Sequence, residues 1–301
     1  MTAARKAKTV GFVGLGAMGA PMVKNILAAG LPVVVYDLDS SKTERLAAFG
    51  AEVGACPADV ARRAHVLISM VDTTQQALDV IVGRNGFIDG AEAGDVVVSM
   101  GTIDPEAVRK MHATLAATGV DIIDAPVTGM IAGAESGALK AYVGGALSAL
   151  ETARPALASM TSEIRHIGGL GQGIIIKLVN NMLAQAGRVL VVEAMVLGAK
   201  AGIDPETIID VVTSTSGNSV VFETSAPRML SRDFTGIRMD ITIKDLELET
   251  QLGKSLGVPM FMAAVAQQVY QMGKAAGLGN EDPTAIVKVY EQLTGISLAK
   301  V

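Results

Sequence analysis

The most constraining feature of the sequence is a glycine-rich hexapeptide between a short apolar run and a stretch with helical periodicity. The apolar run ends at Val13, and the helical stretch extends to about Ala29. In such a strand–turn–helix unit the first glycine permits a tight turn, the second lets a pyrophosphate reach the backbone, and the third lets helix and strand pack closely. The free N–H groups of the first helical turn would face the phosphates. The residues expected to bind a dinucleotide here are Gly14, Leu15, Gly16, Ala17, Met18 and Gly19.

An acidic residue, Asp37, follows the second predicted strand at the position where dinucleotide-binding units hold the adenosine ribose. Its carboxylate would repel a ribose 2′-phosphate, although Lys42 and Arg45 would offset part of that repulsion. The sequence therefore favours NAD and leaves NADP as the alternative. The competing interpretation of the hexapeptide is a glycine turn in another α/β fold.

The N-terminal half alternates short β-branched runs with helical stretches up to about His166. This alternation predicts an α/β Rossmann domain, with a mostly parallel sheet and helices on both faces, over residues 1–166. Helix starts are indicated by the capping-box spacing from Ser41 to Glu44 and by Asp104 before Pro105. The expected strands are Val10–Val13, Val33–Tyr36, Val66–Ser69, Val96–Ser99 and Asp121–Asp124.

The strand pattern stops after about Gly168, so we expect an all-α domain over residues 167–301. Its first helix is predicted over 173–201 and is apolar on more than one face, which favours burial or self-association as a homodimer or homotetramer. Further helices are predicted from Asp204, over 239–256, over 259–275 and over 283–293.

The overall charge and composition exclude several classes of partner. The formal net charge is −5, and the basic residues are scattered, which argues against nucleic acid. Cys56 is the only cysteine, so the chain has no internal disulfide, and a cytoplasmic location fits best. Residues 1–8 are expected to be a loose tail without a secretion signal, and no apolar run is expected to span a membrane.

Lys177 is the one charge in an otherwise uncharged stretch over residues 173–183, and burial of an unpaired ammonium is costly. Asn181 lies four residues further on, on the same helical face. An amine and an amide so placed could move a proton and hold a substrate hydroxyl, provided that desolvation and a positively charged nicotinamide lower the pKa of the lysine. The alternative is a lysine whose stem covers apolar surface while its amine reaches water.

Four segments in this order and spacing resemble the β-hydroxyacid dehydrogenase family over nearly the whole chain. They are the hexapeptide from Gly14, the segment Asp124–Gly129, the segment from Gly171 through Lys177 to Asn181, and the pair Lys244 and Asp245. The resemblance implies an oxidoreductase that moves hydride between NAD(P) and the hydroxyl-bearing carbon of a short 3-hydroxy carboxylate. A small hydroxy acid or semialdehyde would be the substrate.

The resemblance also implies roles for individual residues. Lys177 corresponds to the family's general acid/base, and Asn181 to its partner. Thr128, Gly129 and Met130 lie in the loop that holds the substrate carboxylate. The further residues expected to contact the cofactor are Met70, Val71, Thr102, Lys244 and Asp245.

Three positions depart from the family pattern and bear on which substrate fits. Met130 stands where a second glycine is usual, Gly101 replaces a frequent serine, and Met70 and Val71 precede Asp72 without the usual proline. We therefore expect a reshaped pocket around Met130. The activity most expected is like that of 3-hydroxyisobutyrate dehydrogenase, with a 2-hydroxy-3-oxopropionate (tartronate semialdehyde) or other semialdehyde reductase as the alternative.

Other functions receive less support from the residues. A non-catalytic dinucleotide-binding scaffold or an imine reductase would be expected to lack the lysine at position 177. Ser136, Ser214, Ser216 and Ser219 have no histidine and acid near them in the sequence, so hydrolysis is not expected, although a triad could assemble from distant positions. A metal site is not expected either, because His65, His112 and His166 have no partners at ligand spacing.

Overall fold

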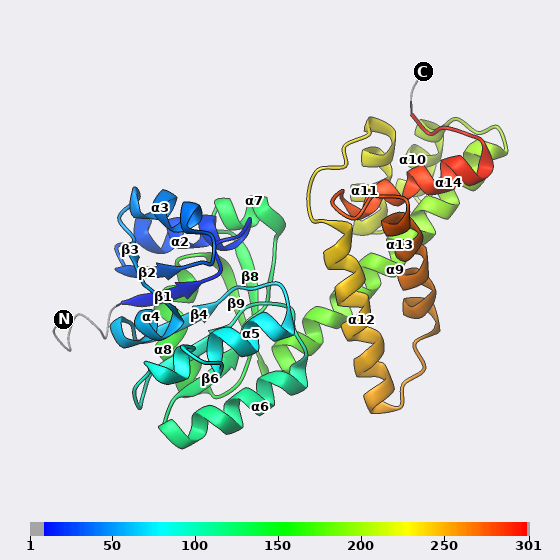
Figure 1. Cartoon of the computed structure of the whole chain (residues 1–301). Helices are drawn as coiled ribbons and strands as arrows, with labels where there is room; N and C mark the ends of the chain where they lie inside the picture. The colour runs from blue at the N-terminus through cyan, green and yellow to red at the C-terminus, as the bar shows by residue number, and fades with distance from the viewer. Residues whose placement is uncertain (1–8, 300–301) are drawn as a thin grey trace. The chain divides into compact units, whose positions relative to one another are not determined.

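A computed structural model describes residues 9–299, so the predicted tail at residues 1–8 lies outside the described part. The chain folds into two compact units, of which the first extends to Lys177 and the second begins at Leu178 (Figure 1). The strands of the first unit are β1 Val10–Val13, β2 Val33–Tyr36, β3 Glu52–Val53, β4 Val66–Ser69, β5 Val96–Ser99, β6 Asp121–Asp124, β7 Val127–Thr128, β8 Leu139–Gly144 and β9 Thr161–Gly168.

The sheet of the first unit has the strand order β3-β2-β1-β4-β5-β6-β8-β7, and β9 pairs with β8. The strands from β3 to β6 are parallel, with Val10 opposite both Val33 and Val66. This is the order of a Rossmann sheet, in which the chain crosses over after β3 and starts again beside β1 at β4. The predicted Rossmann fold and its five strands are confirmed.

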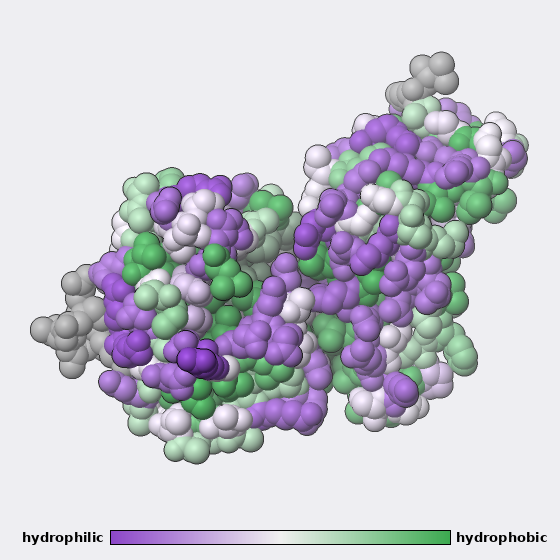
Figure 2. All heavy atoms as spheres, viewed as in Figure 1, coloured by the Kyte–Doolittle hydropathy of each residue, from purple (hydrophilic) through white to green (hydrophobic). Residues whose placement is uncertain are grey.

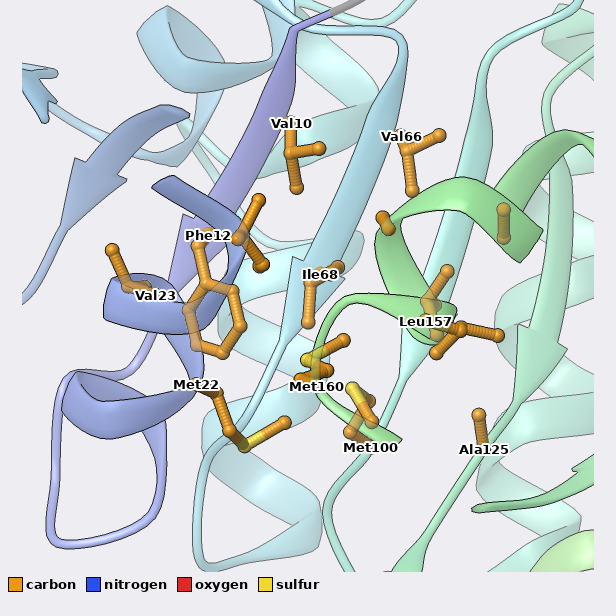
Figure 3. Packing of buried hydrophobic residues seen from close by; sticks show 14 of the residues in the cluster. Val10, Phe12, Met22, Val23, Val66, Ile68, Met100, Ala125, Leu157 and Met160 are labelled. Atoms are coloured by element: carbon orange, nitrogen blue, oxygen red, sulfur yellow. The ribbon is translucent and has the colours of Figure 1, made fainter. Parts of the chain in front are cut away.

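Helices cover both faces of this sheet, as the alternation predicted (Figure 1). Val33 and Val35 pack in a cluster with side chains of the helices α2 (Gly19–Ala28) and α8 (Leu147–Ala158), whereas Val34, on the opposite face, is equally buried. Figure 3 shows Phe12 and Ile68 packed against Met22 of α2 and Met160 after α8. The helices are α2 Gly19–Ala28, α3 Ser40–Ala47, α4 Pro57–Arg63, α5 Thr74–Ile81, α6 Pro105–Leu115, α7 Met130–Glu135 and α8 Leu147–Ala158, with 3-10 turns η1 Phe87–Asp89 and η2 Ala116–Thr118.

Two predicted helix starts have different outcomes. At α6 the carboxylate of Asp104 accepts a hydrogen bond from the N–H of Glu106, and Pro105 occupies the first turn, as predicted. At α3 the predicted capping box is wrong, because the cap is Asp39, whose carboxylate accepts from the N–H of Ser41. Asp39 lies two residues earlier, so α3 begins before the box could form.

The second unit is helical in its described residues, as predicted. Its elements are α9 Gln172–Lys200, which starts in the first unit, α10 Pro205–Thr213, α11 Val220–Ser231, α12 Met239–Leu256, α13 Phe261–Ala275, the 3-10 turn η3 Pro283–Ile286 and α14 Val287–Thr294. Val192 and Met195 of α9 pack with Leu246 of α12 and Tyr270 of α13 in one core. Val192 and Tyr270 are fully buried in this core, so the apolar character of α9 is partly explained by its packing in the unit.

By length and composition, α9 could cross a membrane, and it is the one such helix within residues 9–299. The expectation that no segment reaches this length and apolarity is therefore wrong for α9. The core helix of a water-soluble domain meets the same criterion, and a third of the apolar window of α9 is buried within the protein. Several large apolar side chains along it are nevertheless exposed, namely Val179, Leu183, Leu190 and Leu197.

Candidate active site

The glycine-rich turn after β1 has the geometry that its glycines predict. Gly14 has φ 99°, and a Cβ there would lie 2.3 Å from the carbonyl oxygen of Met70, so only glycine fits. A Cβ on Gly19 would lie 2.0 Å from the carbonyl oxygen of Gly14. Because glycine has no Cβ, α2 can start close against the strand. A Cβ on Gly16 would meet nothing within 4 Å, and Gly16 is exposed. The turn therefore presents open backbone at its second glycine, where a pyrophosphate would approach.

The side chain of Asp37, just after β2, accepts a hydrogen bond from the backbone of the glycine-rich turn. Its Oδ2 accepts a hydrogen bond of 2.7 Å from the N–H of Leu15, and its Oδ1 accepts one of 2.9 Å from the N–H of Asp39. The amine of Lys42 lies 3.3 Å from the same Oδ1. The partly buried carboxylate of Asp37 thus lies beside the turn and next to Lys42, one of the two cations expected to offset its charge.

The ends of β4 and β5 lie beside the same turn. Met70 approaches Gly14, as described above, and a Cβ on Gly101 would lie 2.4 Å from the carbonyl oxygen of Val71. This close approach explains why glycine replaces the family's frequent serine at position 101. Thr102 follows directly and is half-buried. Met70, Val71 and Thr102 are therefore brought together at the carboxyl ends of parallel strands, where Rossmann sheets bind their ligands.

Lys177 lies in the second turn of α9, and its Nζ donates a hydrogen bond of 3.3 Å to Oγ1 of Thr128 at the end of β7. Both residues are half-buried. The chain segments that carry them are 49 residues apart in the sequence. The structure therefore joins the predicted acid/base to the loop that the family resemblance assigns to the substrate carboxylate.

Asp124, at the end of β6, connects the sheet to the start of α9. Its Oδ1 accepts a hydrogen bond of 2.6 Å from the N–H of Gly171, and its Oδ2 accepts one of 2.7 Å from the N–H of Ile174. Glycines enclose the carboxylate, since a Cβ on Gly144 would lie 2.5 Å from Oδ1 and one on Gly173 would lie 2.8 Å from Oδ2. Asp124 is fully buried, and it satisfies N–H groups that the helix itself cannot satisfy.

Burial raises the pKa of the Asp124 carboxyl from 3.8 to about 6, because desolvation outweighs the hydrogen bonds from Gly171 and Ile174 that favour the ionised form. The sequence motif drew attention to the segment from Asp124 to Gly129 but gave no role to the aspartate itself. Its partners are backbone N–H groups 47 and 50 residues later, and backbone groups leave no signal in a sequence.

In the second unit, Nδ2 of Asn181 donates a hydrogen bond of 2.8 Å to Oδ2 of Asp245, and Nζ of Lys244 lies 2.9 Å from Oδ1 of the same aspartate. Asn181 belongs to α9, and the other two residues belong to α12. The resemblance named these residues separately, and the structure joins them in one polar cluster. Asp245 therefore holds the amide of Asn181, four residues beyond Lys177 along α9.

Glu249, one turn after Asp245 in α12, was not predicted from the sequence. It is 3% exposed, and neither carboxyl oxygen has a hydrogen-bond partner in the described part of the chain. Burial, and secondarily the negative charge of Asp245, raise the pKa of Glu249 to about 8. Glu249 is therefore mainly protonated at neutral pH.

Within residues 9–299, no three side chains of histidine, cysteine, aspartate or glutamate lie where they could hold a metal ion together. His65 does have an acidic partner, contrary to the prediction from the sequence. Its Nδ1 lies 2.8 Å from Oδ1 of the buried Asp95. His65 directly precedes β4, and Asp95 directly precedes β5. The pair therefore lies at the opposite ends of these strands from Met70 and Gly101.

These features fit a dinucleotide cofactor. The open backbone at Gly16, the carboxylate of Asp37 and the strand ends at Met70 and Thr102 form the kind of surface that a pyrophosphate and an adenosine ribose require. A lysine in contact with a threonine hydroxyl adds a group that can transfer protons. Fold and site together define an NAD(P)-dependent oxidoreductase.

Comparison with known proteins identifies the family. A family model described as the NAD binding domain of 6-phosphogluconate dehydrogenase matches residues 9–168. A second, described as "NAD-binding of NADP-dependent 3-hydroxyisobutyrate dehydrogenase", matches residues 171–290. The chain belongs to the β-hydroxyacid dehydrogenase family.

Similar proteins align over nearly their full length. A 2-(hydroxymethyl)glutarate dehydrogenase from Eubacterium barkeri is 36% identical, with 98% of each chain covered. An L-threonate dehydrogenase from Cupriavidus necator is 33% identical over 94% of this chain and 96% of that protein. A solved structure of a Mycobacterium tuberculosis 3-hydroxyisobutyrate dehydrogenase with L-serine has a TM-score of 0.86 and 28% identity, and covers 94% of this chain and 99% of that one.

The chain is therefore an NAD(P)-dependent enzyme that acts on a CH–OH group of a small molecule. Its fold class and cofactor class agree with the predictions from the sequence.

Proposed function

We propose that this protein interconverts a short 3-hydroxy carboxylate and the corresponding semialdehyde, as 3-hydroxyisobutyrate dehydrogenases do. The observation that carries the proposal is the contact of 3.3 Å between Nζ of Lys177 and Oγ1 of Thr128. The contact supports the proposal because Thr128 belongs to the loop that the family resemblance assigns to the substrate carboxylate. With the carboxylate bound at this loop, a hydroxyl on C3 of the substrate would lie within reach of the amine of Lys177.

In the oxidising direction, the deprotonated amine of Lys177 accepts the O–H proton of the substrate as the carbonyl forms, and it returns a proton in the reducing direction. When bound, the nicotinamide cofactor accepts or donates the hydride at the hydroxyl-bearing carbon. Thr128 accepts a hydrogen bond from the amine and so restricts its position. Thr128 and Gly129 hold the carboxylate, and Asn181, itself held by Asp245, orients the hydroxyl.

Residues 1–166 form the NAD(P)-binding domain in this proposal, and residues 167–301 form the substrate and dimerisation domain. The cofactor contacts are the hexapeptide from Gly14 to Gly19 together with Asp37, Met70, Val71 and Thr102. Lys244 and Asp245 are kept as cofactor contacts on the strength of the family resemblance.

Replacement of Lys177 tests the proposal. Lys177→Ala should lower kcat by about 10²–10⁴-fold, the range typical of a lost general acid or base. NADH binding, followed by fluorescence titration, should be unchanged, because the glycine-rich turn is intact. The matched control is Lys200→Ala at the other end of α9, which should retain activity. Ordinary turnover by Lys177→Ala would refute the mechanism.

NAD is the preferred cofactor in this proposal, because the carboxylate of Asp37, beside the glycine-rich turn, would repel a ribose 2′-phosphate bound there. NADP remains the alternative, since Lys42 lies 3.3 Å from that carboxylate. A 2-hydroxy-3-oxopropionate reductase, or a reductase of another semialdehyde, is the alternative substrate assignment. Steady-state oxidation of 3-hydroxypropionates that carry hydrogen, methyl or hydroxyl at C2, measured with NAD and with NADP, separates these possibilities.

We further propose that the chain is a cytoplasmic homodimer or homotetramer. The exposed leucines Leu183, Leu190 and Leu197 recur every seven residues along α9, so they form one apolar stripe on the helix. Figure 2 shows apolar patches on the surface of the helical unit as well. Exposed apolar surface of this kind favours association of copies. Sedimentation of the wild type and of Leu190→Lys would test this.

A further inference from the structure

Helix α7 directly follows Thr128 and Gly129, which we call the substrate loop because the proposed function assigns the substrate carboxylate to them. The helix extends only over Met130–Glu135, and isolated helices of fewer than about 12 residues are marginal in water. Contacts with the rest of the first unit must therefore hold α7 in place. Whatever fixes α7 also fixes the loop from which it starts, and Thr128 of that loop accepts the hydrogen bond from Lys177.

Apolar packing holds α7 close to strand β8. A Cβ on Gly129 would lie 3.0 Å, and one on Gly133 3.2 Å, from Cδ2 of the buried Leu139. The two glycines therefore let the backbone of α7 approach the sheet. Apolar contact is non-directional, so it does not by itself set the rotation of α7 or the path of the substrate loop into it.

A directional contact joins α7 to α2, the helix that follows the glycine-rich turn. Nδ2 of Asn25 donates a hydrogen bond of 2.7 Å to the carbonyl oxygen of Ala134. A carbonyl oxygen can only accept, so the amide nitrogen of Asn25 must face it. Ala134 is fully buried and lies in the last turn of α7, where the carbonyl groups have no partner within the helix. Asn25 therefore satisfies the end of α7 and fixes its position on α2.

The helix that carries Asn25 also forms the cofactor turn. It begins at Gly19, against the carbonyl oxygen of Gly14, and Asn25 lies in its second half, where α2 and α7 are side by side (Figure 1). Lys24, the preceding residue, faces α3 instead, since its amine lies 4.2 Å from the centre of the Phe49 ring. One helix thus starts at the turn expected to hold the pyrophosphate and, through Asn25, holds the helix that follows the substrate loop.

We propose that Asn25 is a positioning residue, which couples binding of the substrate carboxylate to binding of the cofactor. Its bond to Ala134 makes the substrate loop and α2 move together. A dinucleotide that orders the start of α2 then orders the loop as well, so the substrate meets a loop that is already in place. Because such coupling is reciprocal, the substrate must tighten cofactor binding by the same factor. The inference rests on the proposed function, which assigns the carboxylate to this loop.

The first test measures this coupling at equilibrium. NADH and a hydroxy acid cannot react with each other, so NADH can be titrated by fluorescence with and without 3-hydroxy-2-methylpropionate. The wild type should bind NADH more tightly when the acid is present. Asn25→Ala should bind NADH alone as the wild type does, because the glycine-rich turn is intact. The tightening by the acid should shrink by about fivefold, the factor that one neutral hydrogen bond supplies.

Steady-state kinetics at saturating NAD separate positioning from a general loss of structure. In Asn25→Ala the KM for the hydroxy acid should rise by about fivefold, while kcat should change by less than about twofold, because a weakened carboxylate contact affects substrate and transition state alike. Asn25→Asp keeps the shape of the side chain but presents an ionised oxygen, which cannot donate, to Ala134. It should raise KM at least as much, and it serves as the test if Asn25→Ala does not fold.

Lys24→Gln is the matched control, because Lys24 is exposed on the same helix and faces away from α7. It should leave both the KM and the tightening unchanged. A lower Tm for the two Asn25 variants, with wild-type KM and wild-type tightening, would show that Asn25 serves stability alone and would leave the proposed function intact. A wild type whose NADH affinity does not respond to an acid that it oxidises would overturn the coupling.

The proposed function fails by a different observation. If the wild type binds NADH but oxidises none of the 3-hydroxypropionates with hydrogen, methyl or hydroxyl at C2, the substrate assignment is wrong, and the inference that rests on it is overturned too.

Discussion

The carboxylate of Asp124 accepts a hydrogen bond of 2.7 Å from the backbone N–H of Ile174. With its second bond, to the N–H of Gly171, it ties the first turn of α9 to the end of β6. Lys177 follows Ile174 by three residues, within one turn of the helix. The position of the candidate acid/base beside Thr128 therefore depends on how Asp124 holds the backbone at the start of α9.

Asp124→Ala should weaken both folding and catalysis. The substitution leaves the buried N–H groups of Gly171 and Ile174 without their acceptor, which costs roughly 1–3 kcal/mol for each unsatisfied group. The free energy of unfolding in urea should fall by an amount of this order. The kcat should fall more than the KM rises, because Lys177 is displaced while the cofactor turn remains.

Asp121→Ala is the control for this variant, since Asp121 starts the same strand and is exposed. It should resemble the wild type in both measurements. If Asp124→Ala retained wild-type kcat at a temperature where it is fully folded, the aspartate would serve stability alone.

Glu249 should make the protein less stable as the pH rises. Its pKa is about 8 in the folded chain against 4.5 for an ordinary glutamate, so the folded state keeps a proton that the unfolded state loses. Below about pH 4.5 both states are protonated and the residue has no effect. Between pH 4.5 and pH 8 the free energy of unfolding falls by up to roughly 1.4 kcal/mol per pH unit.

Glu249→Gln removes the titrating group and should therefore be more stable than the wild type at pH 7–8, by a few kcal/mol at most. The two proteins should converge near pH 4.5. Urea unfolding across this pH range measures the difference, with Glu247→Gln as the control on the exposed face of the same helix. Parallel stability curves for wild type and Glu249→Gln would contradict the raised pKa.

Much of the fold was predictable from the sequence because its signals are local. The five central strands are runs of four residues rich in valine and isoleucine, and all five have the predicted bounds. The later strands β8 and β9 were not assigned, because lysine, arginine and glutamate alternate with apolar residues there, and β9 lies on the outer side of β8. Side chains at such a position are partly exposed and lack a continuous apolar run.

The candidate site was predictable only in part. The glycine-rich turn and Lys177 have recognisable surroundings in the sequence, whereas the partner of Asn181 is 64 residues away on another helix. The family resemblance predicted Asp245 as a cofactor contact but did not predict its hydrogen bond with Asn181. The left-handed backbone of Met130, with φ 57°, was not predictable either, because an unusual φ is a property of the folded backbone.

Asp37 should control the choice between the two cofactors. Asp37→Asn keeps a side chain that can accept from the N–H of Leu15 but removes the charge that would repel a 2′-phosphate. The ratio of kcat/KM for NAD over NADP should fall by about tenfold, which corresponds to roughly 1.4 kcal/mol. Asp39→Asn, which preserves the cap of α3, should leave the ratio unchanged.

Gly16 and Gly19 should respond differently to the same added methyl group. A Cβ at Gly16 meets nothing within 4 Å, so Gly16→Ala should fold with an unchanged Tm. It should nevertheless weaken NADH binding at least about tenfold, because the second glycine lets the pyrophosphate approach the backbone. A Cβ at Gly19 would lie 2.0 Å from the carbonyl oxygen of Gly14, so Gly19→Ala should lower the Tm as well.

Calorimetry and an NADH titration on the two variants measure both effects. A Gly16→Ala protein that binds NADH as the wild type does would show that the cofactor does not use this turn. Loss of binding in Gly16→Ala at full stability would locate the pyrophosphate at the second glycine, since no atom of the protein itself explains the loss.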